Sequence, residues 1–419
     1  NINMYIRKAP YNFGWDWGPR ILTIGIWKQV FMEGWNDARV EYTHYITESI
    51  DKKKAVVKVE VDALVDKQIT DAELVIKNND IVLSRQPVVL EKGANHIEAT
   101  FRIKNPRLWW CNGMGEQNMY DFSAQIVAEN KVIASQNDRI GLRTIRLEQE
   151  KDQWGCSFRF ILNGVPVYAK GVNVIPFDNI LSDVTPETYR RNLEPAAQAN
   201  MNMLRVWGGG IYETDEFYRQ CDSLGLMIWQ DFIFSCTLYP SEGQLLETMR
   251  EEFADNIRRI RNHPSLALWC GSNELEYSWA SKKLRTMNTQ ENMDKIWQMY
   301  LDQNKAIQEA LDTLCPEICY QPSSPFRGYG KNKSPYEGDY HSWSVLSGSK
   351  PITYFEEGFS RFYSEYGYES FDYYESLVRY APREEDQRIY SDVMLWHQRQ
   401  GYNAVRANNN IIRYISDNY

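Results

Sequence analysis

The sequence predicts an α/β barrel of the TIM type preceded by an immunoglobulin-like β-sandwich, because the texture of the chain changes twice along its 419 residues. Residues 39–142 alternate apolar and polar side chains with period two, whereas residues 143–419 repeat strand, loop and helix in order. Residues 1–38 are aromatic and rich in glycine. A chain of this length exceeds one ordinary domain, so two or three are expected.

Strand periodicity is clearest in residues 39–142. Val57, Val59 and Val61 would share one face of a strand, with charged residues between them on the other face. Residues 74–76 and 125–127 are further apolar strand centres, and Asn, Asp and Gly turns separate the segments. Several short strands in one such region favour an immunoglobulin-like sandwich.

The third region alternates apolar strands with helices. Strands are expected at residues 167–170, 203–206, 226–229, 266–269, 318–320 and 354–357 and near Tyr340 and Phe362, and helices at residues 185–199, 214–224, 249–260 and 291–314. This alternation indicates a parallel sheet and favours a (β/α)₈ barrel over an open sheet. A helical tail at 384–419 follows with no eighth strand after it. The barrel is therefore expected to be truncated at its C-terminal end, and these residues alone to be insoluble or inactive.

Residues 1–38 are expected to form a strand, a turn and a second strand that ends at residues 26–31. So small a segment cannot bury a core of its own. We therefore expect it to be the end of a larger domain or to pack onto its neighbour.

Composition and charge exclude several classes of function. The net charge is −9 and basic residues are mixed with acidic ones, so no nucleic-acid surface is expected. No apolar run reaches about 18 residues, which argues against a membrane span. The seven cysteines form no CxxC pair and the five histidines no HExxH motif, so buried thiols and no metal site are expected. Disulfides, the oligomeric state and the compartment (periplasmic, lysosomal or cytoplasmic) stay open.

Two glutamates are candidates for chemistry. Glu274 follows the apolar strand 266–269 and a turn of small residues, and Glu365 lies in the aromatic segment 361–367. Polar residues at the carboxyl ends of barrel strands face the active site. Two such acids suit glycoside cleavage, in which one protonates the leaving oxygen and the other attacks the anomeric carbon. The alternative for Glu274 is a structural acid favoured by a helix dipole.

Two further patterns carry less information. Residues 208–210 are three glycines without a following GK[ST] sequence, so a tight turn beside Trp207 is a better interpretation than a phosphate loop. Asn332 begins an N-glycosylation sequon, which is weak as a lone pattern.

Five segments resemble motifs of glycoside hydrolase family 2, in the order in which that family's barrel carries them. They are residues 170–173, 204–213, 229–232, 261–274 and 364–367. Residues 13–19 resemble a loop that β-mannosidases send from their N-terminal domain into the active site, and residues 338–343 resemble the family's sixth-strand segment. Both features point to the β-mannosidase branch of the family. The alternative for residues 13–19 is a tight aromatic turn, although Asp16 between two tryptophans would be costly without a polar partner.

The resemblance implies roles for individual residues. Glu274 would be the general acid/base and Glu365 the nucleophile, which Arg205 would keep ionised. Asn273 would bind the 2-hydroxyl of the sugar, and Asp16 hydroxyls at the far end of the mannose. The other substrate-binding candidates are Trp17, Asn173, Trp207, His341 and Trp343, with a structural histidine as the alternative for His341.

The resemblance further implies that residues 1–38 are the tail of a jelly-roll domain and that the protein is a retaining exo-β-mannosidase. It would remove terminal β-D-mannose from mannose-containing oligosaccharides through a covalent glycosyl-enzyme. No cofactor is expected, because both steps use carboxyl groups. The alternatives are another family 2 activity (β-galactosidase, β-glucuronidase or exo-β-glucosaminidase) and a non-catalytic carbohydrate-binding fragment.

Overall fold

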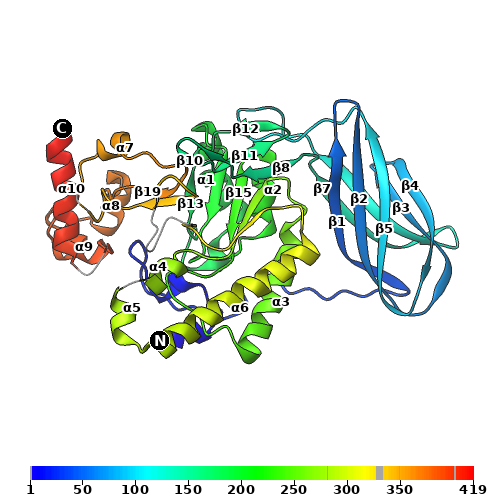
Figure 1. Cartoon of the computed structure of the whole chain (residues 1–419), viewed down its shortest axis with the longest axis horizontal. Helices are drawn as coiled ribbons and strands as arrows, with labels where there is room; N and C mark the ends of the chain where they lie inside the picture. Colours follow the sequence, from blue (N-terminus) through cyan, green and yellow to red (C-terminus); the bar gives the residue numbers. More distant parts are fainter. Residues whose placement is uncertain (1, 281, 327–333, 349, 401–402) are drawn as a thin grey trace.

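The computed structural model describes residues 2–280, 282–326, 334–348, 350–400 and 403–419. Asn332, with its glycosylation sequon, lies outside these residues. Figure 1 shows a β-sandwich at one end, a parallel sheet with helices in the centre, and a small helical part at the other end. No helix within the described ranges is long and apolar enough to cross a membrane.

The sandwich is built from antiparallel strands in two sheets. Its strands are β1 (Ala38–Ile50), β2 (Lys54–Val65), β3 (Ile69–Asn78), β4 (Ile81–Leu90), β5 (Gly93–Lys104), β6 (Tyr120–Ala128) and β7 (Lys131–Ile140). The strand orders are β1-β2-β5 and β4-β3-β6-β7. Val57, Val59 and Val61 are fully buried in the shared core, as their period-two spacing predicts. The immunoglobulin-like topology stays a prediction.

Hydrogen bonds join the sandwich to the central part of the molecule. The Tyr45 N–H donates to Asn262 Oδ1 at 3.0 Å, and Asn262 donates to the Thr43 carbonyl at 3.0 Å. His44 Nε2 lies 2.8 Å from Glu317 Oε1. Strand β1 therefore anchors the sandwich against the parallel sheet's own loops.

Residues 145–167 form small antiparallel sheets, which correct the strand expected at residues 167–170. Their strands are β8 (Ile145–Glu148), β9 (Lys151–Asp152), β10 (Gly155–Cys156), β11 (Arg159–Leu162) and β12 (Val165–Val167). Strand β12 pairs back onto β11. Asn163 and Gly164 between them have φ of 51° and 80°, the backbone of a two-residue hairpin turn. This turn returns the chain before the parallel sheet begins.

The central sheet is parallel, with strand order β13-β14-β15-β16-β17. The strands are β13 (Gly171–Val174), β14 (Met203–Val206), β15 (Met227–Asp231), β16 (Leu266–Cys270) and β17 (Tyr320–Gln321), and the helices are η3 (Leu181–Asp183), α1 (Pro186–Gln198), α2 (Asp215–Leu224), α3 (Gly243–Ile260), α4 (Leu275–Ala280), α5 (Lys282–Met287) and α6 (Gln290–Leu314). Strands β14, β15 and β16 are buried throughout. Met249, Phe253 and Ile257 of α3 pack into the same core, which confirms the predicted amphipathic face.

A second, two-stranded parallel sheet follows. It contains β18 (Tyr340–Ser342) and β19 (Tyr363–Tyr366), which confirm the strands expected near Tyr340 and Phe362. The strand expected at residues 354–357 is wrong, because this segment forms the short helix α7 (Tyr354–Glu357), with two acids in its first turn and Gly358 after it. Helices α8 (Tyr374–Tyr380), η4 (Glu384–Gln387), α9 (Asp392–His397) and α10 (Ala404–Asn418) complete this part.

The parallel strands do not close into a barrel within the described residues. Strands β13 and β17 each have one neighbour in the five-stranded sheet, and β18 pairs with β19 alone. The structure therefore supports a parallel α/β architecture, and the (β/α)₈ barrel with a missing last strand stays a prediction.

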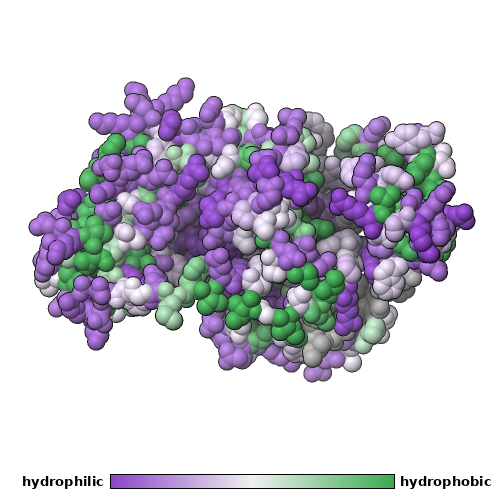
Figure 2. All heavy atoms as spheres, turned by 180° about the vertical axis from the view of Figure 1, so that it is seen from behind, coloured by the Kyte–Doolittle hydropathy of each residue, from purple (hydrophilic) through white to green (hydrophobic). Residues whose placement is uncertain are grey.

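The strand pair expected in residues 1–38 is wrong. The described part of this segment contains the turns η1 (Ile2–Tyr5) and η2 (Pro10–Phe13) and a single bridge between Trp15 and Gly18. Ile24, Val30 and Met32 are exposed, so this apolar stretch has no neighbouring strand to complete its hydrogen bonds. Figure 2, which views the molecule from behind the view of Figure 1, shows hydrophobic atoms gathered in a band along the lower edge of the molecule.

Candidate active site

Predicted site residues from separate segments converge at the carboxyl ends of the parallel strands. Asn173 lies on β13, Arg205 on β14 and Glu365 on β19, while Asn273 and Glu274 follow β16. The strand register places Asn173 directly opposite Arg205. Parallel strands end at one edge of a sheet, and this edge is where α/β proteins of this kind carry their active sites.

The base of the site is a network of polar side chains around one arginine, which we call the floor. Its members are Asn173, Arg205, Asp231, Asn273 and Glu365. Arg205 donates to Glu365 Oε1 at 2.7 Å and to Asp231 Oδ2 at 2.8 Å. It also donates to the Oδ1 atoms of Asn273 (2.7 Å) and Asn173 (3.1 Å). Because Arg205 is only 4% exposed, these charge-assisted bonds fix both the guanidinium and Glu365 in one orientation.

Glu274 and Glu365 face each other across His341. His341 Nδ1 lies 2.8 Å from Glu274 Oε1 and 3.2 Å from Glu365 Oε2. One oxygen of each carboxylate and one nitrogen of His341 all lie within 4.8 Å of one another. Paired carboxyl groups are about 5–5.5 Å apart in retaining glycosidases and about 6.5–9.5 Å apart in inverting ones. One oxygen of each predicted acid therefore lies within 4.8 Å of an oxygen of the other.

Burial and charge act in opposite directions on these three groups. Burial raises the pKa of Glu365, and the positive charges of His341 and Arg205 only partly offset it. Burial is the largest effect on Glu274 and raises its pKa, but the hydrogen bond and charge of His341, with smaller contributions from Cys236 and Arg205, together outweigh it, so the net shift of the pKa is downward. Burial lowers the pKa of His341, but the charges of Glu365 and Glu274 raise it by more. The opposite shifts of the His341 and Glu274 pKa values favour a proton on the imidazole rather than on Glu274.

Glu274 is held in an unusual backbone conformation. Its φ of +56° lies in the left-handed region, which costs a residue other than glycine about 1–3 kcal/mol and is frequent at functional sites. The Glu274 N–H donates to the Ser324 carbonyl at 2.8 Å. Cys236 Sγ lies 3.5 Å from Glu274 Oε2. These contacts hold the carboxylate against the floor.

One side of the site is formed by three tryptophans and by an aspartate that lies between two of them in the sequence, and we call this side the aromatic wall. Its members are Trp15, Asp16, Trp17 and Trp207. Trp15 and Trp17 meet the Trp207 ring edge to face, at centroid distances of 4.8 and 5.9 Å. The Tyr11 N–H donates to the Gly209 carbonyl at 3.0 Å, which ties this distant segment to the loop after β14. A Cβ on Gly209 would lie 1.8 Å from the Trp207 ring, so the glycine is what allows the ring to lie there.

The floor and the wall enclose a pocket of about 980 Å³. The predicted residues that line it are Asp16, Trp17, Asn173, Trp207, Asn273, Glu274, Trp343 and Glu365. Arg205 and His341 do not line it; they lie buried behind the two glutamates. Burial raises the pKa of Asp16, a backbone hydrogen bond lowers it, and the negative charge of Glu274 raises it further.

Three residues of the site have no role in the sequence prediction. Asp231 pairs with Arg205, Asp339 accepts hydrogen bonds from four groups beneath His341, and Cys236 touches Glu274. Asp231 ends β15 and Asp339 directly precedes β18. The sequence could have indicated both as site candidates, because each is an acidic residue at an end of a strand. Nothing in the sequence around Cys236 indicates its contact with Glu274.

Three groups of described side chains could offer ligands to a metal ion. They are Glu274–His341–Glu365, His44–Cys315–Glu317 and Glu60–His96–Glu98. In the first two, hydrogen bonds of 2.8 Å already join the histidine to a glutamate. Cleavage of a glycoside by two carboxyl groups uses neither a metal nor an organic cofactor.

Comparison with known proteins identifies relatives. The family model described as glycosyl hydrolases family 2 matches residues 38–143, and one described as glycosyl hydrolase 2 galactose-binding domain-like matches residues 1–28. β-Mannosidase B of Emericella nidulans is 33% identical over 405 residues, covering 94% of this chain and 47% of the relative. β-Mannosidase B of Aspergillus oryzae is 35% identical over 407 residues, covering 94% and 48%.

Solved structures agree with these matches. The β-D-mannosidase of Dictyoglomus thermophilum superposes with a TM-score of 0.88 at 35% identity, covering 98% of this chain and 49% of that one. A β-glucuronidase of Bacteroides uniformis, at 17% identity and a TM-score of 0.56 over 68% of this chain and 34% of that one, shares the fold alone. The chain belongs to glycoside hydrolase family 2. The three relatives of 33–35% identity are named as β-mannosidases, and the chain spans about half their length.

Proposed function

We propose that this chain carries the active site of a retaining exo-β-mannosidase. The observation that carries the proposal is the pair Glu274 and Glu365, from different strands, with oxygens within 4.8 Å at a pocket that the aromatic wall closes on one side. A pocket closed in this way accepts the end of a sugar chain better than its middle. The substrates are then oligosaccharides that end in β-D-mannose.

In the first step Glu365 attacks the anomeric carbon. The bond from that carbon to the leaving oxygen breaks while Glu274 gives this oxygen a proton, and a glycosyl ester forms on Glu365. Arg205, 2.7 Å from Oε1, holds Glu365 and opposes the effect of burial on its pKa. Asn273 lines the pocket beside Glu274 and is placed to bind the 2-hydroxyl of the sugar.

In the second step Glu274 acts as the general base and Glu365 is the leaving group. Glu274 takes a proton from water, the water oxygen attacks the anomeric carbon, and the ester bond to Glu365 breaks. Two displacements at one carbon return its original configuration. The short separation of the carboxyl groups leaves little room for the water that a single-displacement reaction needs.

Recognition of mannose falls to the aromatic wall and to Trp343. Asp16 would accept hydrogen bonds from hydroxyls remote from the reacting carbon, while Trp17, Trp207 and Trp343 would contact the apolar face of the ring. Asn173 lines the same pocket and would contact the sugar from the floor.

We further infer that the parallel sheet belongs to a (β/α)₈ barrel spanning residues 143–419, that residues 39–142 are an immunoglobulin-like sandwich, and that residues 1–38 belong to a jelly-roll domain. The two-sheet topology and the family matches at residues 38–143 and 1–28 support this division.

The test is substrate comparison on the intact protein. We expect kcat/KM for 4-nitrophenyl β-mannoside to exceed that for the β-galactoside and the β-glucuronide by about 10²-fold or more, because a site built to bind particular hydroxyls rejects their epimers. A preference for either of the other two sugars would contradict the substrate. Sugar binding without turnover of any of the three would favour the non-catalytic alternative.

A further inference from the structure

A buried chain of hydrogen bonds ends on His341. Asp339 is fully buried and accepts from Gln321 Nε2 and the Phe326 N–H, each at 2.7 Å, and from Ser364 Oγ at 2.5 Å. Both oxygens of this carboxylate therefore accept hydrogen bonds. Ser324 Oγ lies 2.6 Å from the same carboxylate.

The hydrogen on Ser324 decides the state of His341 Nε2. A hydroxyl has one hydrogen to donate, and an ionised carboxylate has none. Ser324 therefore donates to Asp339. Ser324 Oγ also lies 3.0 Å from His341 Nε2, and it must accept in that bond, so Nε2 carries a proton.

The other ring nitrogen points at the catalytic carboxylates. His341 Nδ1 lies 2.8 Å from Glu274 Oε1 and 3.2 Å from Glu365 Oε2. Because Nε2 is already protonated, one further proton lies between Nδ1 and Glu274 Oε1. It sits either on the nitrogen, giving an imidazolium and a carboxylate, or on the oxygen, giving a neutral imidazole and a carboxylic acid.

We propose that His341 stores the proton that Glu274 gives to the leaving group. This inference rests on the proposed function and concerns the same site. When the sugar binds, the Nδ1–H bond of His341 breaks and an Oε1–H bond forms on Glu274. Nε2 keeps its own proton and still donates it to Ser324 Oγ. Glu274 then passes that proton to the leaving oxygen, and the water of the second step replaces it. His341 lies behind the pocket, so it is a positioning residue that acts through Glu274.

The charges around His341 are consistent with this role. Glu274, Glu365 and, through Ser324, Asp339 favour the protonated ring, whereas Arg205 opposes it. A sugar between the wall and the two glutamates removes water from Glu274, and this desolvation favours its neutral, protonated form. Substrate binding thus moves the proton in the direction that catalysis needs.

The test is the pH profile of His341→Asn. The Asn Nδ2 takes the place of Nδ1 and can still donate to the glutamates, but it cannot release a proton. We expect the basic limb of kcat/KM for 4-nitrophenyl β-mannoside to move down by about one pH unit or more, since Glu274 must then hold the proton by itself. An unchanged basic limb, or a loss that is equal at every pH, would overturn the proposal.

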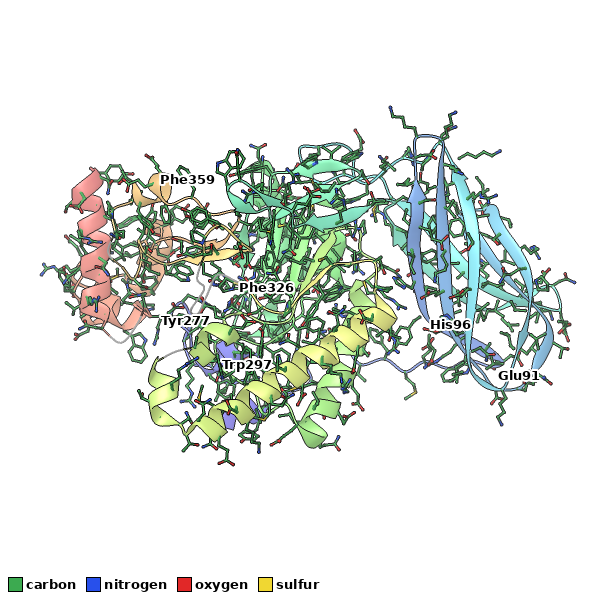
Figure 3. All side chains as sticks on the ribbon, in the orientation of Figure 1. Glu91, His96, Tyr277, Trp297, Phe326 and Phe359 are labelled. Carbon is green, nitrogen blue, oxygen red and sulfur yellow. The ribbon has the colours of Figure 1, made fainter. Side chains whose placement is uncertain are left out.

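Two companion measurements keep the result interpretable. 2,4-Dinitrophenyl β-mannoside needs little protonation of its leaving group, so its basic limb should be weak in both proteins. His96→Gln should leave every profile unchanged. Figure 3 shows His96 on the sandwich, far from Phe326, whose N–H holds Asp339.

Ser324→Ala provides a second test that leaves the ring in place. It removes the acceptor of Nε2–H, so the basic limb should move in the same direction as in His341→Asn; a basic limb that stays in place would contradict the stored proton. If the unaltered protein turned over no β-mannoside, the proposed function and this inference would both fail.

Discussion

On the floor, a buried arginine contacts two carboxylates and two amides, whereas on the wall three indole rings pack against one another and the Asp16 side chain is exposed at the pocket. The floor comes from strands of the five-stranded sheet and from β19 of the two-stranded sheet. The wall joins the loop after β14 to a segment almost 200 residues earlier in the chain. The floor is therefore part of the structural core, and removing a charge there affects folding as well as chemistry. The wall can change without disturbing that core.

The largest expected effect is at the floor's nucleophile. Glu365→Ala should abolish turnover, because no covalent glycosyl-enzyme can form. Added azide should restore part of the activity and give a glycosyl azide of inverted configuration, which NMR of the product would show. Near-normal hydrolysis by the variant would contradict the assignment of Glu365.

Arg205→Met tests whether the floor serves folding and chemistry together. The change leaves Asp231 buried without a cation and removes one of the two cations that face Glu365, which should lower the free energy of unfolding by about 3–5 kcal/mol. Urea unfolding would measure this loss, and kcat/KM should fall as well. Arg205→Lys is the matched control, since it keeps the charge but cannot reach all four partners. A variant that is as stable as the unaltered protein would contradict the comparison.

Glu274 lies between the two regions, and its loss should depend on the leaving group. In Glu274→Ala, hydrolysis of mannobiose should fall by about 10²–10⁴-fold because general acid catalysis is lost. With 2,4-dinitrophenyl β-mannoside the first step should survive, and a burst should show that the glycosyl-enzyme accumulates. Equal losses on both substrates without a burst would count against the acid/base role.

Asp16→Ala tests the wall. It should lower kcat/KM by roughly 10²–10⁴-fold if two charged hydrogen bonds, each worth about 1.5–3 kcal/mol, are lost at the transition state. The free energy of unfolding should change by less than about 0.5 kcal/mol, as is usual for an exposed residue. An effect on kcat/KM below about threefold would mean that the aromatic loop is only structural.

The smallest effect is expected behind the wall, at Glu213. This residue follows the glycines after Trp207, and burial raises its pKa to about 7 although Tyr189 donates a hydrogen bond to it at 2.8 Å. A raised pKa means that the stability from this group is present below its ordinary pKa of 4.5 and is lost as the pH rises to about 7. Glu213→Gln should therefore be more stable than the unaltered protein at pH 8 by on the order of 1–3 kcal/mol.

The comparison at low pH provides the control for this prediction. At about pH 4.5 both proteins carry a neutral group at position 213, so their unfolding curves should coincide. Equal stability at pH 8 would show that Glu213 is solvated or paired well enough to stay charged without cost.

Periodicity predicted much of the fold, and local turn chemistry explains several of its errors. Helix α3 and strands β14 to β16 agree with the predicted segments, because their apolar side chains face one core. The Asn163–Gly164 turn sends Val165–Val167 back onto β11, which an apolar run alone does not indicate. Residues 1–38 have strand-like composition, but a strand also needs a partner.

The position of a site residue was predictable where the residue belongs to a single motif, while its role stays a prediction. Glu274, Glu365 and Asp16 are examples, and the structure places all three at one pocket. Roles that arise from contacts between segments were not predictable. Ser324 follows β17, whereas Asp339 precedes β18 and His341 lies on it, so the hydrogen bonds that join the three residues have no signature in the sequence.

The contact between Tyr11 and Gly209 also has a consequence for protein synthesis. About 350 residues are translated between Asp16 and Glu365. At about 5–20 residues per second, Glu365 follows Asp16 after a delay on the order of 20–70 s. For the first half of that time Trp15 and Trp17 have no Trp207 to pack against. The nascent chain thus carries a solvent-exposed pair of tryptophans that must be kept from aggregation, and it cannot bind sugar productively until almost all of these residues have been translated.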